Sequence, residues 1–155
     1  MAANIPAEHV DLALARSEFI DAYNAADAAV RAVLTALGSE PKQLLCHNID
    51  QLSKLPAAPN YSKEWRSKIA ASLAELRQLQ SVRCDLVHGQ MEILTIDGAA
   101  HALFANVQKQ SIVGRAGLLL TLVEMQASRD KLRRIATQLV RPALTEVTRV
   151  DAAIA

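Results

Sequence analysis

The sequence has few of the residues that mark several large classes of protein. Aromatic residues make up 3% of its 155 residues, and it contains 5 glycines, 5 prolines and 2 cysteines. Two cysteines, Cys46 and Cys84, are too few for a disulfide scaffold, so we expect reduced thiols in the cytoplasm. The formal net charge of +1 argues against a globally basic nucleic-acid-binding protein, although 17 lysines and arginines are enough for a local basic patch.

The sequence also lacks the pattern of an export signal or a membrane span. The N-terminus, MAANIPAEHVDLALARSEF, has neither a basic start nor a long apolar run. The most apolar segment, 112–125, is too short to cross a bilayer and contains Arg115 and Glu124. We therefore expect a cytoplasmic protein without a membrane partner.

What the sequence does contain favours packed helices. Hydrophobic residues make up 51% of the chain, and with so few aromatic residues they are mainly alanine and leucine. A chain of this length can form a single domain with its own core. Helical periodicity predicts an all-α antiparallel up-and-down four-helix bundle, a single domain over 1–155 with helices at about 7–37, 41–55, 61–88 and 108–140.

The expected helix ends follow from local signals. Gly38 ends the first helix, and Pro41 is allowed in the first turn of the second. Asn60 or Ser62 can cap the third helix. Pro142 kinks or ends the fourth helix, and the residues that follow form a short final helix.

Beyond Gly89 the apolar pattern no longer has a helical period. Residues 91–96 and 100–104 are short apolar runs, and Asp97-Gly98 between them is a strong signal for a two-residue turn. We expect a β-hairpin at about 91–105, inserted between the third and fourth helices. Because two isolated strands are only marginally stable, the hairpin should pack on helices or on a partner chain.

The stretch Leu73–Gly89, LAELRQLQSVRCDLVHG, predicts the end of a long amphipathic helix. Its apolar residues fall at the spacings of one helical stripe. Arg83 takes a position on that stripe, where long charged side chains are rarely buried without a partner. His88 falls in the last turn, and we expect Gly89 to follow as a left-handed C-terminal cap.

Arg83 and His88 form an R-x4-H pattern, and of the 4 histidines only His88 has an arginine five residues before it. This motif closes a long helix, with two expected helices before it and another long one after it. That order resembles the higher eukaryotes and prokaryotes nucleotide-binding (HEPN) domains, over about residues 19–140. In many members of the family the residue after the arginine is polar, often Asn, whereas here it is Cys84, followed by Asp85.

The resemblance implies metal-independent RNA cleavage by a homodimer, with no cofactor, in which the motif helices of two protomers form one composite cleft. In this interpretation His88 carries the proton, because histidine changes charge near physiological pH. Arg83 holds the scissile phosphate, and Asp85, on the same helix face as His88, orients the imidazole. A role in bacterial defence or as a toxin further implies a cognate antitoxin or regulator as a partner.

Two other groups of residues are candidates for binding. Arg129, Arg133 and Arg134 are candidate phosphate contacts, with a solvated helix end as the alternative interpretation. His47 and Asp50 lie three residues apart, but no third ligand follows at a convincing spacing, so we expect no metal site.

Each motif residue also has a simpler interpretation. His88 can be a capping residue without chemistry, and Arg83 can form a structural ion pair with Asp85, Glu75 or a residue elsewhere. Cys84 can be a small buried hydrophobe. The alternatives to the nuclease are a non-catalytic HEPN module that binds RNA, nucleotide or a protein partner, and a purely structural helical dimer.

Overall fold

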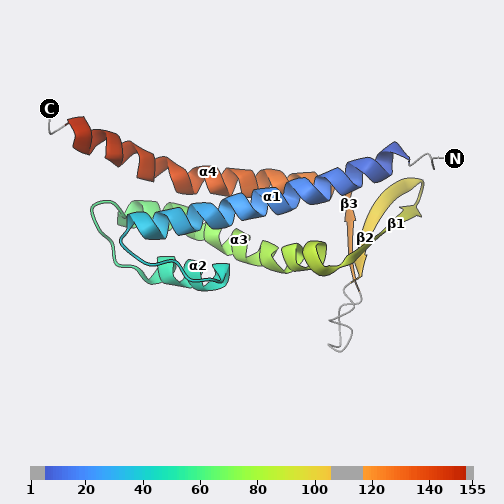
Figure 1. The fold of residues 1–155 in the computed structure, drawn as a ribbon, viewed down its shortest axis with the longest axis horizontal. Coiled ribbons are helices and arrows are strands. Elements are labelled where there is room, and N and C mark those ends of the chain that lie inside the picture. Colours follow the sequence, from blue (N-terminus) through green and yellow to red (C-terminus); the bar gives the residue numbers. More distant parts are fainter. Residues whose placement is uncertain (1–5, 106–116, 153–155) are drawn as a thin grey trace. The chain divides into compact units, whose positions relative to one another are not determined.

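The computed structural model describes the backbone of residues 6–105 and 117–152, and side chains as far as residue 140 (Figure 1). The described part of the chain is mostly helical, with a small antiparallel sheet. Its elements, in chain order, are α1 (Ala7–Ala36), α2 (Leu45–Lys54), α3 (Lys63–His88), β1 (Gln90–Ile96), β2 (Ala99–Ala105), β3 (Leu118–Thr121) and α4 (Leu122–Ala152).

Helices α1 and α3 begin and end close to the predicted positions. Gly38 has a φ of 71°, and the amide of Ser39 donates to the carbonyl of Leu34 at 2.9 Å, which closes α1 with a Schellman motif. At the start of α3, the amide of Trp65 donates to the hydroxyl of Ser62 at 3.2 Å. Ser62, rather than Asn60, is therefore the N-cap of α3.

Helix α2 begins four residues later than predicted, at Leu45 rather than Pro41. The buried Asn48 side chain holds the preceding segment in a turn. Its carbonyl oxygen accepts from the amide of Lys42 at 2.6 Å, and its amide group donates to the carbonyl of Lys42 at 3.0 Å. Both backbone groups of Lys42 are thereby engaged outside a helix.

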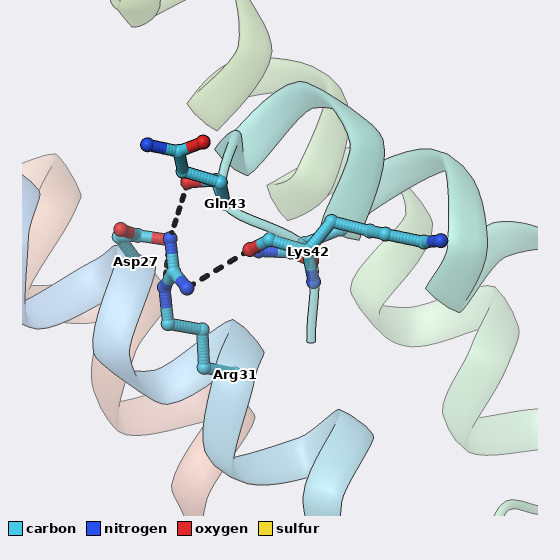
Figure 2. Close-up of polar contacts among 5 residues, drawn as sticks. Asp27, Arg31, Lys42 and Gln43 are labelled. Atoms are coloured by element: carbon cyan, nitrogen blue, oxygen red, sulfur yellow. Dashed lines mark hydrogen bonds and ion pairs between the residues drawn. The ribbon is translucent and has the colours of Figure 1, made fainter. Parts of the chain in front are cut away.

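Arg31 of α1 also binds this segment (Figure 2). Its guanidinium donates to the carbonyl oxygens of Lys42 and Gln43 at 2.9 and 2.7 Å. Its Nε forms an ion pair with Asp27 at 3.1 Å, one turn earlier in α1. These long-range contacts explain why the local signal at Pro41 did not start the helix.

The predicted hairpin is confirmed. Strands β1 and β2 pair in antiparallel register, and Asp97 and Gly98 between them have φ values of 51° and 79°, as a type I′ turn requires. Ala102 and Phe104 of β2 are fully buried. The sheet has three strands rather than two, because β3 pairs antiparallel with β2 and gives the order β1-β2-β3 (Figure 1).

Two predictions for the fourth helix were wrong. Residues 118–121 form β3, so the helix begins at Leu122, while residues 106–116 lie outside the described part of the chain. The helix also continues through Pro142 to Ala152, so residues after Pro142 do not form a separate short helix. Membrane crossing would need a longer or more apolar helix than any in the described residues.

The chain divides into two compact units, and α1, α3 and α4 contribute residues to both. The first unit consists of Met1–Tyr23 and Leu79–Lys131, and the second of Asn24–Gln78 and Leu132–Ala155. The first core contains Leu12, Ala15, Phe19, Ala22, Tyr23, Leu86, Ala102, Phe104 and Met125. The second core contains Ala26, Ala29, Val30, Val33, Leu34, Leu45, Ile49, Leu52, Tyr61, Ile69, Leu73, Leu76, Leu132, Ile135 and Leu139.

Candidate functional site

Arg83 lies in the first unit, half-buried against α1. Its guanidinium carbon is 5.9 Å from the centroid of the Tyr23 ring, at a distance typical of cation–π contact. Its Nε atom is buried and has no hydrogen-bond acceptor among the described residues. In the described part of the chain no carboxylate reaches Arg83, so the ion-pair interpretation is not supported there; Glu75 pairs instead with Arg134, at 3.4 Å.

The environment of Arg83 is unusual for a charged side chain. A buried donor without an acceptor costs about 1–3 kcal/mol, and more when the group is charged. Stacking on Tyr23 offsets part of this cost, because the ring face attracts a cation. An anion that accepts from the guanidinium would compensate the rest, which makes Arg83 a candidate binding residue.

His88 is the last residue of α3, as predicted, and its side chain is exposed. Within the described residues its imidazole makes no hydrogen bond, so it does not cap a carbonyl of the helix end. The imidazole is therefore accessible to a substrate.

Asp85 and His88 have opposite environments, although both lie in the last turn of α3. The Asp85 side chain is buried, with 3% of its surface exposed, whereas His88 faces solvent. We predicted that Asp85 orients the imidazole of His88, and the difference in burial between the two side chains does not support this prediction. Cys84, expected as a small buried hydrophobe, is half-buried and has a free thiol.

Gly89 does not have the left-handed conformation that the sequence predicted, since the glycines with positive φ in the described residues are Gly38 and Gly98. Its role is close packing instead. A Cβ atom at Gly89 would lie 2.4 Å from the carbonyl oxygen of Asp85 and 3.2 Å from the Cβ atom of Phe104. The chain thus turns from α3 into β1 where a side chain has no room.

The structure adds Arg16, which sequence reasoning missed. Its Nε donates to the carbonyl oxygen of Leu86 at 2.7 Å, and its guanidinium carbon lies 5.7 Å from the centroid of the Phe104 ring. Arg16 therefore caps one of the last carbonyls of α3, in the turn that carries His88. No local pattern announces this contact, because it joins residues 70 positions apart.

The predicted phosphate contacts near the start of α4 are largely engaged with carboxylates. In the first unit, hydrogen bonds with Asp130 and Glu18 raise the pKa of Arg129. In the second unit, Arg134 pairs with Glu75, while Arg133 is exposed. A phosphate at Arg129 or Arg134 would therefore compete with these carboxylates.

The His47 and Asp50 pair on α2 is likewise explained without a metal. A hydrogen bond with Arg77 lowers the pKa of Asp50 and holds its carboxylate in an ion pair. Across the described ranges, no three His, Cys, Asp or Glu side chains gather as metal ligands would.

No family model, curated protein or solved structure matches this chain.

Proposed function

We propose that the protein is a metal-independent endoribonuclease of the HEPN type, which acts in the cytoplasm as a toxin or defence effector. The observation that carries this proposal is Arg83, a half-buried cation at the motif position that has an unsatisfied Nε and lacks a carboxylate partner among the described residues. The exposed imidazole of His88, five residues further along α3, supports it.

The proposed reaction uses only side chains of this chain and the RNA itself. His88 takes the proton from a ribose 2′-hydroxyl, and the oxygen attacks the adjacent phosphorus. The bond from phosphorus to the 5′-oxygen breaks, the imidazolium of His88 gives its proton to that oxygen, and the other product ends in a 2′,3′-cyclic phosphate. Arg83 stabilises the charge that develops on the phosphate oxygens, because its planar fork matches two of them.

The proposal requires two protomers. Five residues along an α-helix separate two side chains by about 140° around its axis, so Arg83 and His88 do not point together from one helix. In an antiparallel four-helix bundle that dimerises through α3, Arg83 of one protomer can face His88 of the other. We propose this homodimer as the active form, with a cognate antitoxin or regulator as a further partner.

The test is cleavage of RNA in the presence of EDTA, which inactivates contaminating nucleases that depend on a metal. We expect the wild type to leave cyclic-phosphate ends, and Arg83→Ala and His88→Ala each to lower the rate about 100-fold or more. Matched controls are Arg66→Ala and His47→Ala, which change the same residue types elsewhere, and circular dichroism confirms folding. Undiminished cleavage by a folded His88→Ala protein would rule out the mechanism.

A second candidate function is favoured by the burial of Asp85 and the exposure of His88, whose imidazole makes no hydrogen bond with any described carboxylate. In this alternative the same surface binds RNA, nucleotide or a protein partner without cleaving it. Binding would then be lost in Arg83→Ala and retained in His88→Ala, and the wild type would release no cyclic-phosphate product.

A further inference from the structure

Two half-buried arginines of the first unit share an uncommon environment. Arg83 lies over the ring of Tyr23, and Arg16 lies over the ring of Phe104. Neither forms an ion pair with a carboxylate in the described part of the chain, although Arg129 of the same unit has two carboxylate partners. No described carboxylate lies within ion-pair distance of either guanidinium, although the buried Asp85 lies two residues after Arg83 in α3.

The contacts of these arginines place them along one seam between α1 and α3. Arg16 and Tyr23 lie seven residues apart on α1, two turns and about 10 Å along the helix axis. Arg16 reaches the carbonyl of Leu86, while Tyr23 lies under Arg83, so the two helices run in opposite directions here. The two guanidinium groups therefore follow each other along the seam.

The hydrogen bond to the Leu86 carbonyl involves only one of the N–H groups of Arg16. Its Nε donates to Leu86, but the two terminal nitrogens make no hydrogen bond within the described residues. A guanidinium has five N–H donors in a fixed fork, so four remain available. Stacking on Phe104 and Tyr23 restricts both side chains, so that less conformational entropy is lost when an anion binds.

We propose that Arg16 is a second phosphate contact, and that it and Arg83 bind successive parts of one RNA strand along the α1–α3 seam. This inference rests on the proposed function and names how that site holds its substrate. A strand of regularly spaced phosphates suits two separated guanidinium groups, and stacked arginines are common phosphate ligands. Arg129 and Arg134 are engaged with carboxylates. We therefore assign the phosphate contact outside the R-x4-H motif to Arg16 in their place.

The experiment measures binding of a 2′-O-methyl RNA oligomer, which lacks the 2′-hydroxyl and cannot be cleaved. Fluorescence anisotropy across a series of salt concentrations gives the slope of log affinity against log salt. Each phosphate contact to a single strand contributes about 0.7 to this slope. We expect Arg16→Gln and Arg83→Gln each to reduce the slope by about 0.7, and the double variant by about 1.4.

Two variants separate phosphate contact from a purely structural role. Arg16→Lys keeps the charge but not the fork, and should keep the salt slope of the wild type. Arg66→Gln is a matched control, because Arg66 also lies over a tyrosine ring, at 5.8 Å, and donates to the carbonyl of Ser53 at 3.1 Å. Its slope should equal that of the wild type.

A second measurement needs no variant. Phenylglyoxal modifies arginine side chains, and peptide mass spectrometry reads each site. The RNA oligomer should protect Arg16 and Arg83 and leave Arg66 equally modified with and without RNA. If Arg16→Gln does not fold, this protection decides the question.

The outcomes distinguish the inference from the proposed function. An unchanged slope in folded Arg16→Gln, or unprotected Arg16, overturns the inference, while RNA cleavage that depends on Arg83 and His88 leaves the nuclease intact. A wild type that neither binds nor cleaves RNA overturns both. Binding of poly-glutamate in place of RNA, with the same dependence on Arg16 and Arg83, would assign the seam to an acidic protein segment and also overturn it.

Discussion

Gly89 lies where the last turn of α3 meets β1, and the backbone there leaves no room for a side chain. We expect Gly89→Ala to lower the free energy of unfolding by about 1–3 kcal/mol, because the new methyl group overlaps the carbonyl oxygen of Asp85. Urea denaturation measures this change. An equally stable variant would show that the junction relaxes without cost.

Gly38→Ala is the comparison for that variant. A Cβ atom at Gly38 would meet nothing within 4 Å, but its φ of 71° is unfavourable for alanine, by about 1–2 kcal/mol. The destabilisation by alanine therefore has a different cause at each position. The change at Gly89 creates a clash, whereas the change at Gly38 strains the backbone.

Single residues of the candidate site differ in how far the sequence could predict them. The partial burial of Arg83 followed from its place on an apolar stripe, and the position of His88 from the helix end. The packing role of Gly89 depends on Phe104, which comes later in the chain, so its local context suggested a cap instead. Arg16 was not predictable, because its partner lies 70 positions away.

At the scale of elements, the start of α4 depends on a capping box. The hydroxyl of Thr121 accepts from the amide of Glu124 at 3.2 Å, and the carboxylate of Glu124 accepts from the Thr121 amide at 2.8 Å. Hydrogen bonds from the backbone and hydroxyl of Thr121 lower the pKa of Glu124 below its ordinary value of 4.5. The ionised carboxylate therefore stabilises the folded state.

This cap predicts a pH-dependent effect on stability. Because the pKa of Glu124 is lower in the folded state, its contribution is present above pH 4.5 and is lost as the pH falls through the folded-state pKa. At pH 7, Glu124→Gln should lower the free energy of unfolding by about 0.3–1 kcal/mol. Urea denaturation at pH 7 and near pH 3 should show this difference shrinking toward zero.

The control for this prediction is Glu92→Gln, a change in an exposed carboxylate of β1 that makes no hydrogen bond within the described residues. It should leave the stability unchanged at pH 7. A deficit of Glu124→Gln that persists unchanged near pH 3 would contradict the role assigned to the ionised carboxylate.

Elements with strong local signals were predictable, and those decided by distant contacts were not. The hairpin followed from Asp97-Gly98, and α1 from its period and Gly38. Strand β3 lies in an apolar run that suits a helix or a strand equally, and only its pairing with β2 decides between them. The T-x-x-E signature at Thr121 was a readable sign that α4 begins there.

At the scale of the whole molecule, some arginines pair with carboxylates and others lie over aromatic rings, and each unit holds both kinds. Arg129 of the first unit pairs with carboxylates, and Arg66 of the second lies over the Tyr61 ring. In the second unit, Arg31, Arg77 and Arg134 form ion pairs with carboxylates of the same unit. In the first unit, Arg16 and Arg83 stack on aromatic rings without a described carboxylate partner. A net charge of +1 hides this difference, so composition could not predict where an anion binds.

The homodimer proposed here makes a prediction that a site within one chain does not. If Arg83 of one protomer acts with His88 of the other, then inactive Arg83→Ala and His88→Ala proteins should restore RNA cleavage when their subunits are exchanged. Half of the dimers in an equal mixture contain one chain of each variant. In such a dimer, one of the two Arg83–His88 pairs is intact and the other has lost both residues. The mixture should therefore regain about a quarter of the wild-type rate.

The measurement is cleavage in EDTA after the two variants are unfolded together and refolded, with each variant refolded alone as the control. The double variant Arg83→Ala/His88→Ala mixed with the wild type provides a second control, because its mixed dimers also keep only one intact residue of each kind, both on the same chain. Those dimers should be inactive if the site is shared between protomers. A different result would place Arg83 and His88 of one chain in the same site. In that case the mixture of single variants stays inactive, and the mixed dimers of one wild-type and one double-variant chain are active.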